Sequence, residues 1–274
     1  MAYLRPNDIP SHPEPQTAAR SLQVHVHPSR VEPASLTGGV VIVIDALRAS
    51  VTITQALASG VARVVPVMNV EDAFAIRERL WREGVARDRV LLGGERGGVT
   101  IEGFDLDNSP ASYPRERVEG RVVVFTTTNG TSALLHANQA ARVIVGSFAN
   151  LTAVGEAVAS EERPVHILCA GTRDEISMDD CLPAGAMVEM LVRRGRSLLS
   201  DDSARLCRLA WEGANVQEGG VPRAMRESRG GRNLLRIGLR DDVDFCSTLD
   251  TLDVVPEFDV ARGEITLSDR HRED

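Results

Sequence analysis

Three stretches of this sequence repeat one pattern: an unbroken apolar run, a short polar segment, and then a helix-like stretch. The apolar runs are residues 40–44, 122–125 and 165–169, the last of them interrupted by His166, and the polar segments are 45–50, 126–131 and 170–180. Strands that are apolar at every position are buried on both faces, and their alternation with helices is typical of a sheet covered by helices on each side. The pattern predicts a three-layer α/β/α fold with a largely parallel or mixed sheet.

Weaker patterns extend this prediction along the chain. Further strands are expected at residues 62–67, 90–92, 143–145, 252–256 and 263–267, and helices at 71–83, 153–160, 179–194 and 198–213. Pro256 favours an edge position for its strand, because proline cannot donate to the sheet. Residues 62–65 and 141–144 resemble each other, which leaves an internal duplication open.

The domain organisation follows from periodicity. Residues 1–20 are punctuated by proline and show no period, so we expect a flexible N-terminal arm. No linker interrupts residues 21–274, which predicts a single α/β domain.

The basic residues narrow the possible chemistry. All 31 of them are arginine, so the chain contains no lysine. This excludes Schiff-base and pyridoxal-phosphate chemistry, which need a lysine amine, and also a phosphate loop that ends in Gly-Lys-Ser/Thr. An anionic ligand must be held by arginine, backbone N–H groups, hydroxyls or a metal ion.

Charge and composition exclude several classes of partner. The formal charge is −8 and the aromatic residues are only 6 Phe, 2 Trp and 2 Tyr, which predicts no nucleic-acid partner. The longest apolar runs have the length of a strand, so no membrane partner is expected. The chain start lacks a signal-peptide pattern and the four cysteines form no CxxC pair, which predicts reduced thiols and a cytoplasmic location.

Side chains that could carry chemistry follow the predicted strands. In open α/β sheets, ligands bind beyond the carboxyl ends of the strands, so the loops 45–50, 126–131 and 170–180 are expected to form one crevice. The Thr-Thr-Thr-Asn-Gly-Thr segment at 126–131 is typical of a site for phosphate or sulfonate. The alternative is an ordinary capped helix after an Asn-Gly turn.

Charged residues near these loops suggest how such a ligand is held. Asp45 could bind a divalent cation and Arg48 could bind an oxyanion, although a structural ion pair would explain both. Glu95 and Arg96 lie between two glycine pairs, which favours close approach to a ligand over a mobile surface turn. The arginine-rich residues 223–240 could be another anion clamp or a solvated face.

A metal site at His25 and His27 has little support. The two residues are spaced to share one face of a strand, but the other histidines are scattered along the sequence.

Five boxes, taken together, resemble the 2-phosphosulfolactate phosphatase (ComB-like) family. They are Val43-Ile-Asp-Ala-Leu-Arg-Ala-Ser50, Gly94-Glu-Arg96 with residues 102–110, Thr126-Thr-Thr-Asn-Gly-Thr131, Cys169-Ala-Gly-Thr172 with Asp180 and residues 184–186, and residues 244–246 with 253–256. They occur in order between about residues 40 and 256, so the resemblance covers most of the chain.

The resemblance implies an α/β phosphatase that depends on Mg²⁺. The implied reaction is the hydrolysis of 2-phospho-3-sulfolactate to sulfolactate and phosphate, a step towards coenzyme M; a similar phosphorylated hydroxy acid is also compatible. The chain departs from the family pattern at two positions. Gly230 stands where the family has histidine in Ser-x-His-Gly-Arg, and Asp107 stands where it usually has glycine.

These considerations give a specific site hypothesis. The catalytic residues are expected to be Asp45, Arg48, Glu95 and Arg96, and the ligands of Mg²⁺ to be Asp45, Glu95 and Asp180. The small anionic phosphorylated substrate is expected to contact Ser50, Asn108, Thr127, Thr128, Asn129, Gly130, Thr131, Gly171 and Thr172. The alternatives are a non-catalytic anion-binding homologue and a hydrolase or lyase that acts on another small acid. The sequence leaves a homodimer open.

Overall fold

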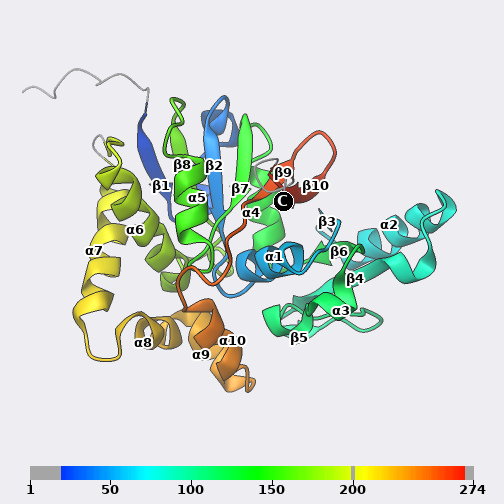
Figure 1. The fold of residues 1–274 in the computed structure, drawn as a ribbon. Helices are drawn as coiled ribbons and strands as arrows, with labels where there is room; N and C mark the ends of the chain where they lie inside the picture. Colours follow the sequence, from blue (N-terminus) through cyan, green and yellow to red (C-terminus); the bar gives the residue numbers. More distant parts are fainter. Residues whose placement is uncertain (1–19, 199–200, 269–274) are drawn as a thin grey trace, which may run out of the picture.

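One mixed β-sheet runs through the computed structural model, which describes residues 20–198 and 201–268 (Figure 1). The strands are β1 (Leu22–His25), β2 (Val40–Ile44), β3 (Arg63–Pro66), β4 (Val90–Arg96), β5 (Val99–Thr100), β6 (Val122–Thr126), β7 (Arg142–Val145), β8 (Val165–Cys169), β9 (Pro256–Asp259) and β10 (Glu264–Leu267). The α-helices are α1 (Ala49–Ala58), α2 (Val70–Arg82), α3 (Arg115–Val118), α4 (Gly130–His136), α5 (Leu151–Ala157), α6 (Met178–Arg193), α7 (Asp202–Val216), α8 (Gly220–Glu227), α9 (Arg229–Arg236) and α10 (Arg240–Cys246). The predicted α/β class is therefore confirmed, while residues 1–19 of the predicted arm lie outside the described residues.

The sheet consists of two parallel blocks that a hairpin joins. Its strand order is β1-β8-β2-β7-β9-β10-β3-β6-β4-β5. The first block, β1-β8-β2-β7, is parallel throughout, and so is the second block, β3-β6-β4. The hairpin β9-β10 pairs antiparallel with both blocks and within itself. Three successive reversals leave the two blocks running in opposite directions, so the sheet is mixed.

Both blocks nevertheless bring strand ends to one region. The carboxyl ends of β2 and β6 lie at diagonally opposite corners of the sheet, because the two strands belong to blocks of opposite direction. The twist of a sheet bends diagonal corners towards the same face. The helices that follow, α1 and α4, therefore begin side by side: a Cβ added at Gly130 would lie 2.7 Å from the Cβ of Ala49.

The connections also bear on the proposed duplication. Helix α1 leads from β2 to β3 and helix α4 leads from β6 to β7, while β2 pairs with β7 and β3 pairs with β6. Two β-α-β units thus cross between the blocks in opposite directions. This is the arrangement that a duplicated half would give, and the duplication itself stays a prediction.

Helices cover both faces of the sheet, as the unbroken apolar strands require. In β2, Ile42 and Ile44 pack on the side of α5 and α6, whereas Val41 and Val43 pack on the side of α1 and α4. Helix α2 covers the second block with a separate cluster of apolar side chains. Figure 1 shows α5, α6 and α7 beside the first block and α2 beside the second. The predicted three-layer arrangement is confirmed.

The two C-terminal strands lie in the middle of the sheet, whereas the sequence predicted an edge position for the strand that contains Pro256. Strand β9 begins at Pro256 and lies between β7 and β10, so the edge prediction for Pro256 is wrong. Its pairing with β7 involves Glu257 and Phe258 and leaves Pro256 outside. Proline is tolerated there because the first residue of a strand need not donate to a neighbour.

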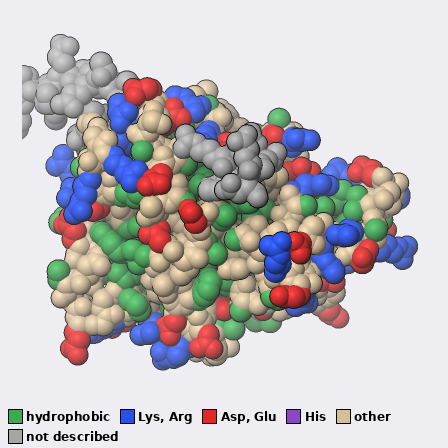
Figure 2. Space-filling model, viewed as in Figure 1, with side chains coloured by type: hydrophobic (Ala, Val, Ile, Leu, Met, Phe, Trp, Pro, Cys, Tyr) green, Lys and Arg blue, Asp and Glu red, His purple; other side chains and the backbone are tan. Residues whose placement is uncertain are grey.

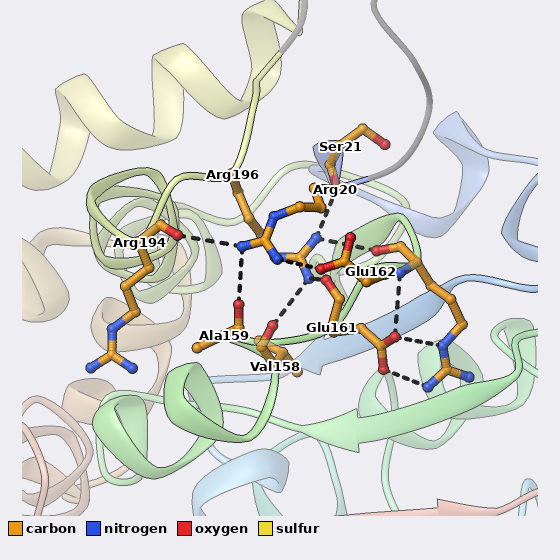
Figure 3. A network of polar contacts seen from close by, with 9 residues as sticks. Arg20, Ser21, Val158, Ala159, Glu161, Glu162, Arg194 and Arg196 are labelled. Atoms are coloured by element: carbon orange, nitrogen blue, oxygen red, sulfur yellow. Dashed lines mark hydrogen bonds and ion pairs between the residues drawn. The ribbon is translucent and has the colours of Figure 1, made fainter.

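Arginine side chains fasten the start of the described chain (Figure 3). Arg20 forms an ion pair with Glu162 at 2.8 Å. Arg196 is buried and donates to the carbonyl oxygens of Ser21, Val158 and Glu161, among others. One guanidinium thus satisfies main-chain acceptors of two segments, before β1 and after α5, and this holds the start of β1 against the end of α5.

The exposed charges are mixed in sign. On the face shown in Figure 2, arginine and acidic side chains alternate over the surface and do not separate into patches of one sign. Several form i,i+4 pairs along helices, such as Arg79–Glu83 and Arg223–Glu227. Exposed pairs of this kind contribute little to stability. In the described residues, no helix combines the length and the apolar character needed to cross a membrane.

Candidate active site

A cavity of about 460 Å³ opens where the ends of β2, β4, β6 and β8 meet helix α9. Three of the charged residues predicted for the site line it, namely Asp45, Arg48 and Glu95. Four of the predicted polar residues also line it, namely Asn108, Thr128, Asn129 and Thr172. The expectation that separate loops form one crevice is borne out, although the loops come from blocks of opposite direction.

Asp45 lies at the floor of the cavity, directly after β2. It is 7% exposed, and its Oδ1 accepts a hydrogen bond from the backbone N–H of Ala49 at 3.3 Å. Burial, together with the nearby carboxylates of Glu95 and Asp179, raises the pKa of Asp45 to about 7. The floor therefore holds more negative charge than the chain itself neutralises.

Glu95 stands at the end of β4, in the glycine-rich turn. Its Oε1 accepts from the backbone N–H and the hydroxyl of Thr128, at 2.8 and 2.9 Å. Its Oε2 accepts from the N–H of Gly98 at 2.6 Å. This carboxylate ties the loop after β6 to the β4–β5 turn, so the turn at residues 93–98 has defined contacts in the structure.

Arg48 forms a buried ion pair, but its partner is a residue that the sequence analysis missed. Its Nη1 lies 2.5 Å from Oδ2 of Asp242 in α10, and the side chains are 2% and 8% exposed. Asp242 also accepts from the hydroxyl of Ser109 at 2.6 Å, and Arg48 donates to the carbonyl of Gly98 at 3.1 Å. No local pattern marks Asp242, which is 194 residues from its partner.

Asp180 holds two site loops in place and does not line the cavity. Its Oδ1 accepts from the N–H of Ala46 and its Oδ2 from the N–H of Gly171, both at 2.8 Å. Burial raises the pKa of Asp180, and Asp179 and Asp45 add to the rise. The chain thus occupies one lone pair on each oxygen of this predicted metal ligand with backbone donors.

Several predicted contact residues support the loops from behind the cavity wall. Ser50 accepts from the N–H of Asp45 at 2.8 Å. Thr127 and Thr131 exchange backbone-to-hydroxyl hydrogen bonds, both at 3.2 Å, as in an ordinary helix start. Gly130 is needed for the close approach of α4, because a Cβ there would lie 2.7 Å from Oδ2 of Asp45.

Two more predicted residues lie outside the cavity lining. Gly171 has φ +69° and gives its N–H to Asp180. Arg96 is exposed and turns away: it donates to the carbonyl of Met68 and the hydroxyl of Thr126, both at 2.9 Å. The structure therefore does not bring Arg96 together with Asp45 and Arg48.

Helix α9 forms a wall of the cavity, which resolves the alternatives for the arginine-rich stretch. Arg229, Arg232 and Arg236 line the cavity, as does Arg173 from the loop after β8. The structure therefore favours the interpretation that this stretch brings positively charged side chains to the cavity over the interpretation as a purely solvated face.

Gly230 lines the cavity at the position where the resembled family has histidine. Its N–H donates to Oδ1 of Asp179 at 3.3 Å, and a Cβ added there would lie 2.5 Å from Oδ2 of the same carboxylate. Asp179 is 2% exposed and also accepts from the hydroxyl of Ser177 at 2.6 Å. The carboxylate of the buried Asp179 thus occupies the space next to Gly230 where the Cβ of any larger residue would lie.

The side-chain oxygen of Asn108 lacks a partner among the described residues. The side chain is 4% exposed and lines the cavity, and its Oδ1 has no hydrogen-bond partner in the described part of the chain. Buried polar atoms without partners are uncommon and each needs an explanation. A ligand in the cavity would provide one.

His25 and His27, which the sequence placed on one face of a strand, make different contacts. His25 stacks on His166, with 3.0 Å between Nε2 and Nδ1. His27 lies beyond β1, where its Nδ1 accepts from the N–H of Ser29. Among the described residues, no group of three or more His, Cys, Asp or Glu side chains is arranged to hold a metal ion alone.

The fold and site define a class: an α/β protein whose acidic floor and arginine-bearing wall enclose space for a small anion. The family model for 2-phosphosulpholactate phosphatase matches residues 25–260, so the chain belongs to this family of phosphoric monoester hydrolases. A protein from Symbiobacterium thermophilum named "Probable 2-phosphosulfolactate phosphatase" is 42% identical over 85% of this chain and 95% of its own length. Proteins with the same name from Clostridium perfringens and Caldanaerobacter subterraneus are 37% and 39% identical, over 89% and 80% of this chain and 95% and 87% of their own lengths.

Proposed function

We propose that this protein hydrolyses the phosphate monoester of a small hydroxy acid, with Mg²⁺ as its cofactor. The candidate substrate is 2-phospho-3-sulfolactate, after the name that the relatives carry. The observation that carries the proposal is that Asp45 and Glu95 line one cavity together with arginine side chains of α9. Family membership supports the phosphatase class, and the cavity supports a small, strongly anionic ligand.

The donor set fits a magnesium ion. Mg²⁺ binds proteins through one or two carboxylates and takes its remaining ligands from water and substrate phosphate. Asp45 and Glu95 line the cavity and would hold the ion, while Asp180 positions the loop that carries Asp45. The raised pKa of Asp45, about 7, reflects burial beside other carboxylates, which a cation would compensate. When bound, the ion would neutralise phosphate charge and help to activate the attacking water.

The other residues have roles that follow from their contacts. Arg48 is held rigid by Asp242 and would bind a phosphate oxygen. The unpartnered Oδ1 of Asn108 would accept a hydrogen bond from a donor group of the ligand or from a bound water. In the reaction, a water oxygen bonds to phosphorus, the ester P–O bond breaks, and the released alcohol oxygen takes up a proton. Donors fixed in advance stabilise the charge that develops on the phosphoryl oxygens.

The test is a panel of phosphate monoesters, assayed for phosphate release with and without Mg²⁺. We expect wild-type protein to require the ion and Asp45→Asn to release no measurable phosphate. Asp253→Asn, at an exposed position away from the cavity, is the matched control and should behave as wild type. Near wild-type turnover by Asp45→Asn would remove Asp45 from the site. Binding of esters without any release would instead identify the non-catalytic homologue, for which the absence of histidine at Gly230 is the motivating observation.

A further inference from the structure

Three of the four cysteines lie in one apolar cluster, although they come from distant parts of the sequence. Cys169 ends β8, Cys181 lies in the first turn of α6, and Cys207 lies in α7. All three belong to the cluster that packs between the sheet and these helices, whereas Cys246 belongs to a separate small cluster. Each of the four is a free thiol, and the proposed hydrolysis uses none of them.

Helices α6 and α7 approach each other closely where two of these thiols lie. Figure 1 shows the two helices side by side, and a Cβ added at Gly185 in α6 would lie 2.0 Å from the carbonyl oxygen of Cys207 in α7. The two backbones are therefore in contact at this point. Cys181 precedes Gly185 by four residues, and residues at this spacing share one face of a helix. The face of α6 that meets α7 thus carries Cys181 one turn from the contact with Cys207.

The thiol of Cys181 lies next to the thiols of both other residues. Contact with Cys181, together with burial, raises the pKa of Cys169 and that of Cys207. The three residues differ in their access to solvent: Cys181 is 7% exposed, Cys207 is 2% exposed and Cys169 is 0% exposed. A small oxidant would therefore reach Cys181 first, and a second thiol already lies beside it.

The first turn of α6 also holds loops of the candidate active site. Asp180, the residue before Cys181, accepts hydrogen bonds from the backbone N–H groups of Ala46 and Gly171, both at 2.8 Å. A covalent bond between Cys181 and α7 would fasten this turn to the neighbouring helix. The cysteine cluster is therefore outside the cavity lining but next in sequence to a residue that positions the site.

We propose that Cys181 and Cys207 form a site of reversible oxidation, at which a peroxide converts the two thiols into a disulfide that links α6 to α7. Hydrogen peroxide oxidises the sulfur of Cys181 to a sulfenic acid, and one water is released. The sulfur of Cys207 then attacks this sulfur, the S–O bond breaks, and a second water leaves. Two thiols and one peroxide thus give one disulfide and two waters, and an added dithiol reverses the reaction by exchange.

Cys207 is the expected partner because the contact at Gly185 brings its backbone to the face of α6 that carries Cys181. Cys169 is the competing partner, and the experiment separates the two. This modification is independent of phosphate hydrolysis, so it stands or falls whether or not the protein is a phosphatase.

Peptide mapping tests the proposal, because each cysteine lies in a tryptic peptide of its own. The chain contains no lysine, so trypsin cleaves only after arginine, and not before Pro164. The peptides 143–173, 174–193, 206–208 and 241–262 contain, in this order, Cys169, Cys181, Cys207 and Cys246. The native full chain is treated with hydrogen peroxide, its remaining free thiols are alkylated in urea, and the digest is analysed by mass spectrometry. We expect peptide 174–193 to be joined to peptide 206–208, in a species that dithiothreitol separates.

Three variants assign the link. Cys207→Ala should abolish it and Cys169→Ala should keep it, while Cys246→Ala, in the separate cluster, is the matched control and should behave as wild type. The proposal is overturned if peptide 143–173 is joined to 174–193 instead, if all four thiols remain open to alkylation, or if the link forms only after unfolding. Wild-type protein alone yields each of these results, so the test does not depend on the folding of a variant.

Discussion

Asp45 should make the metal-free protein less stable as the pH rises. In the folded protein burial and neighbouring carboxylates raise the pKa of Asp45 from 3.8 to about 7. Between these values the folded state keeps a proton that the unfolded chain has lost, so stability falls as the pH rises and levels off above about pH 7. At 1.36 kcal/mol per pH unit, the whole effect is about 4 kcal/mol, of which about 3 kcal/mol falls between pH 5 and pH 8.

The perturbation that isolates this effect is Asp45→Asn, which keeps the shape of the side chain and removes its titration. Urea unfolding in EDTA at pH 5 and pH 8 measures the free energy of unfolding of wild type, Asp45→Asn and the control Asp253→Asn. We expect wild type and the control to lose about 3 kcal/mol more than Asp45→Asn across this interval. Added Mg²⁺ should reduce the loss of wild type at pH 8, because the ion binds the ionised carboxylate. Equal pH dependence in wild type and Asp45→Asn would refute the reasoning.

Three further substitutions test the contacts around the site. Asp242→Asn leaves a buried arginine without its partner and should cost about 3–5 kcal/mol in urea unfolding, whereas the exposed neighbour Asp241→Asn should change little; equal stabilities would contradict the ion pair. Gly230→Ala puts a Cβ 2.5 Å from a buried carboxylate oxygen and should lower the melting temperature, while Gly213→Ala, with open space around it in α7, should raise it slightly; a rise for both would show that the carboxylate moves freely. Asp180→Asn keeps one acceptor where two backbone N–H groups are bound and should cost about 1–3 kcal/mol in urea unfolding, and wild-type stability would show that the two loops do not depend on it.

The strands and the loops that follow them could be predicted because their signals are local. An unbroken run such as residues 40–44 has few stable environments other than a sheet buried on both faces. Polar residues directly after such a run must lie at a sheet end, which located Asp45 and the loop at 126–131. The two glycine pairs singled out Glu95. The family resemblance added Asn108, which no short-range pattern marks.

The features of the site that the sequence did not predict depend on contacts between segments that are distant in the chain. Arg48 follows β2 and Arg96 is the last residue of β4, and both have the same chemistry, yet Arg48 lines the cavity and Arg96 donates to Met68 outside its lining. The difference is set by Asp242, whose place opposite Arg48 arises only when α10 packs on the site. Asp179 and Asp180 are equally buried neighbours that face different loops. Sequence spacing does not contain these distinctions.

The position of Pro256 connects the error in the fold prediction to the origin of the site. Had β9 been an edge strand, the two blocks could have formed one parallel sheet with all carboxyl ends along one side. The β9–β10 hairpin instead lies between the blocks and reverses the second one. The cavity then forms where two diagonal corners bend towards each other, with α1 and α4 starting side by side. Each block supplies one floor carboxylate, Asp45 from the first and Glu95 from the second, so the floor exists only when both blocks are joined correctly.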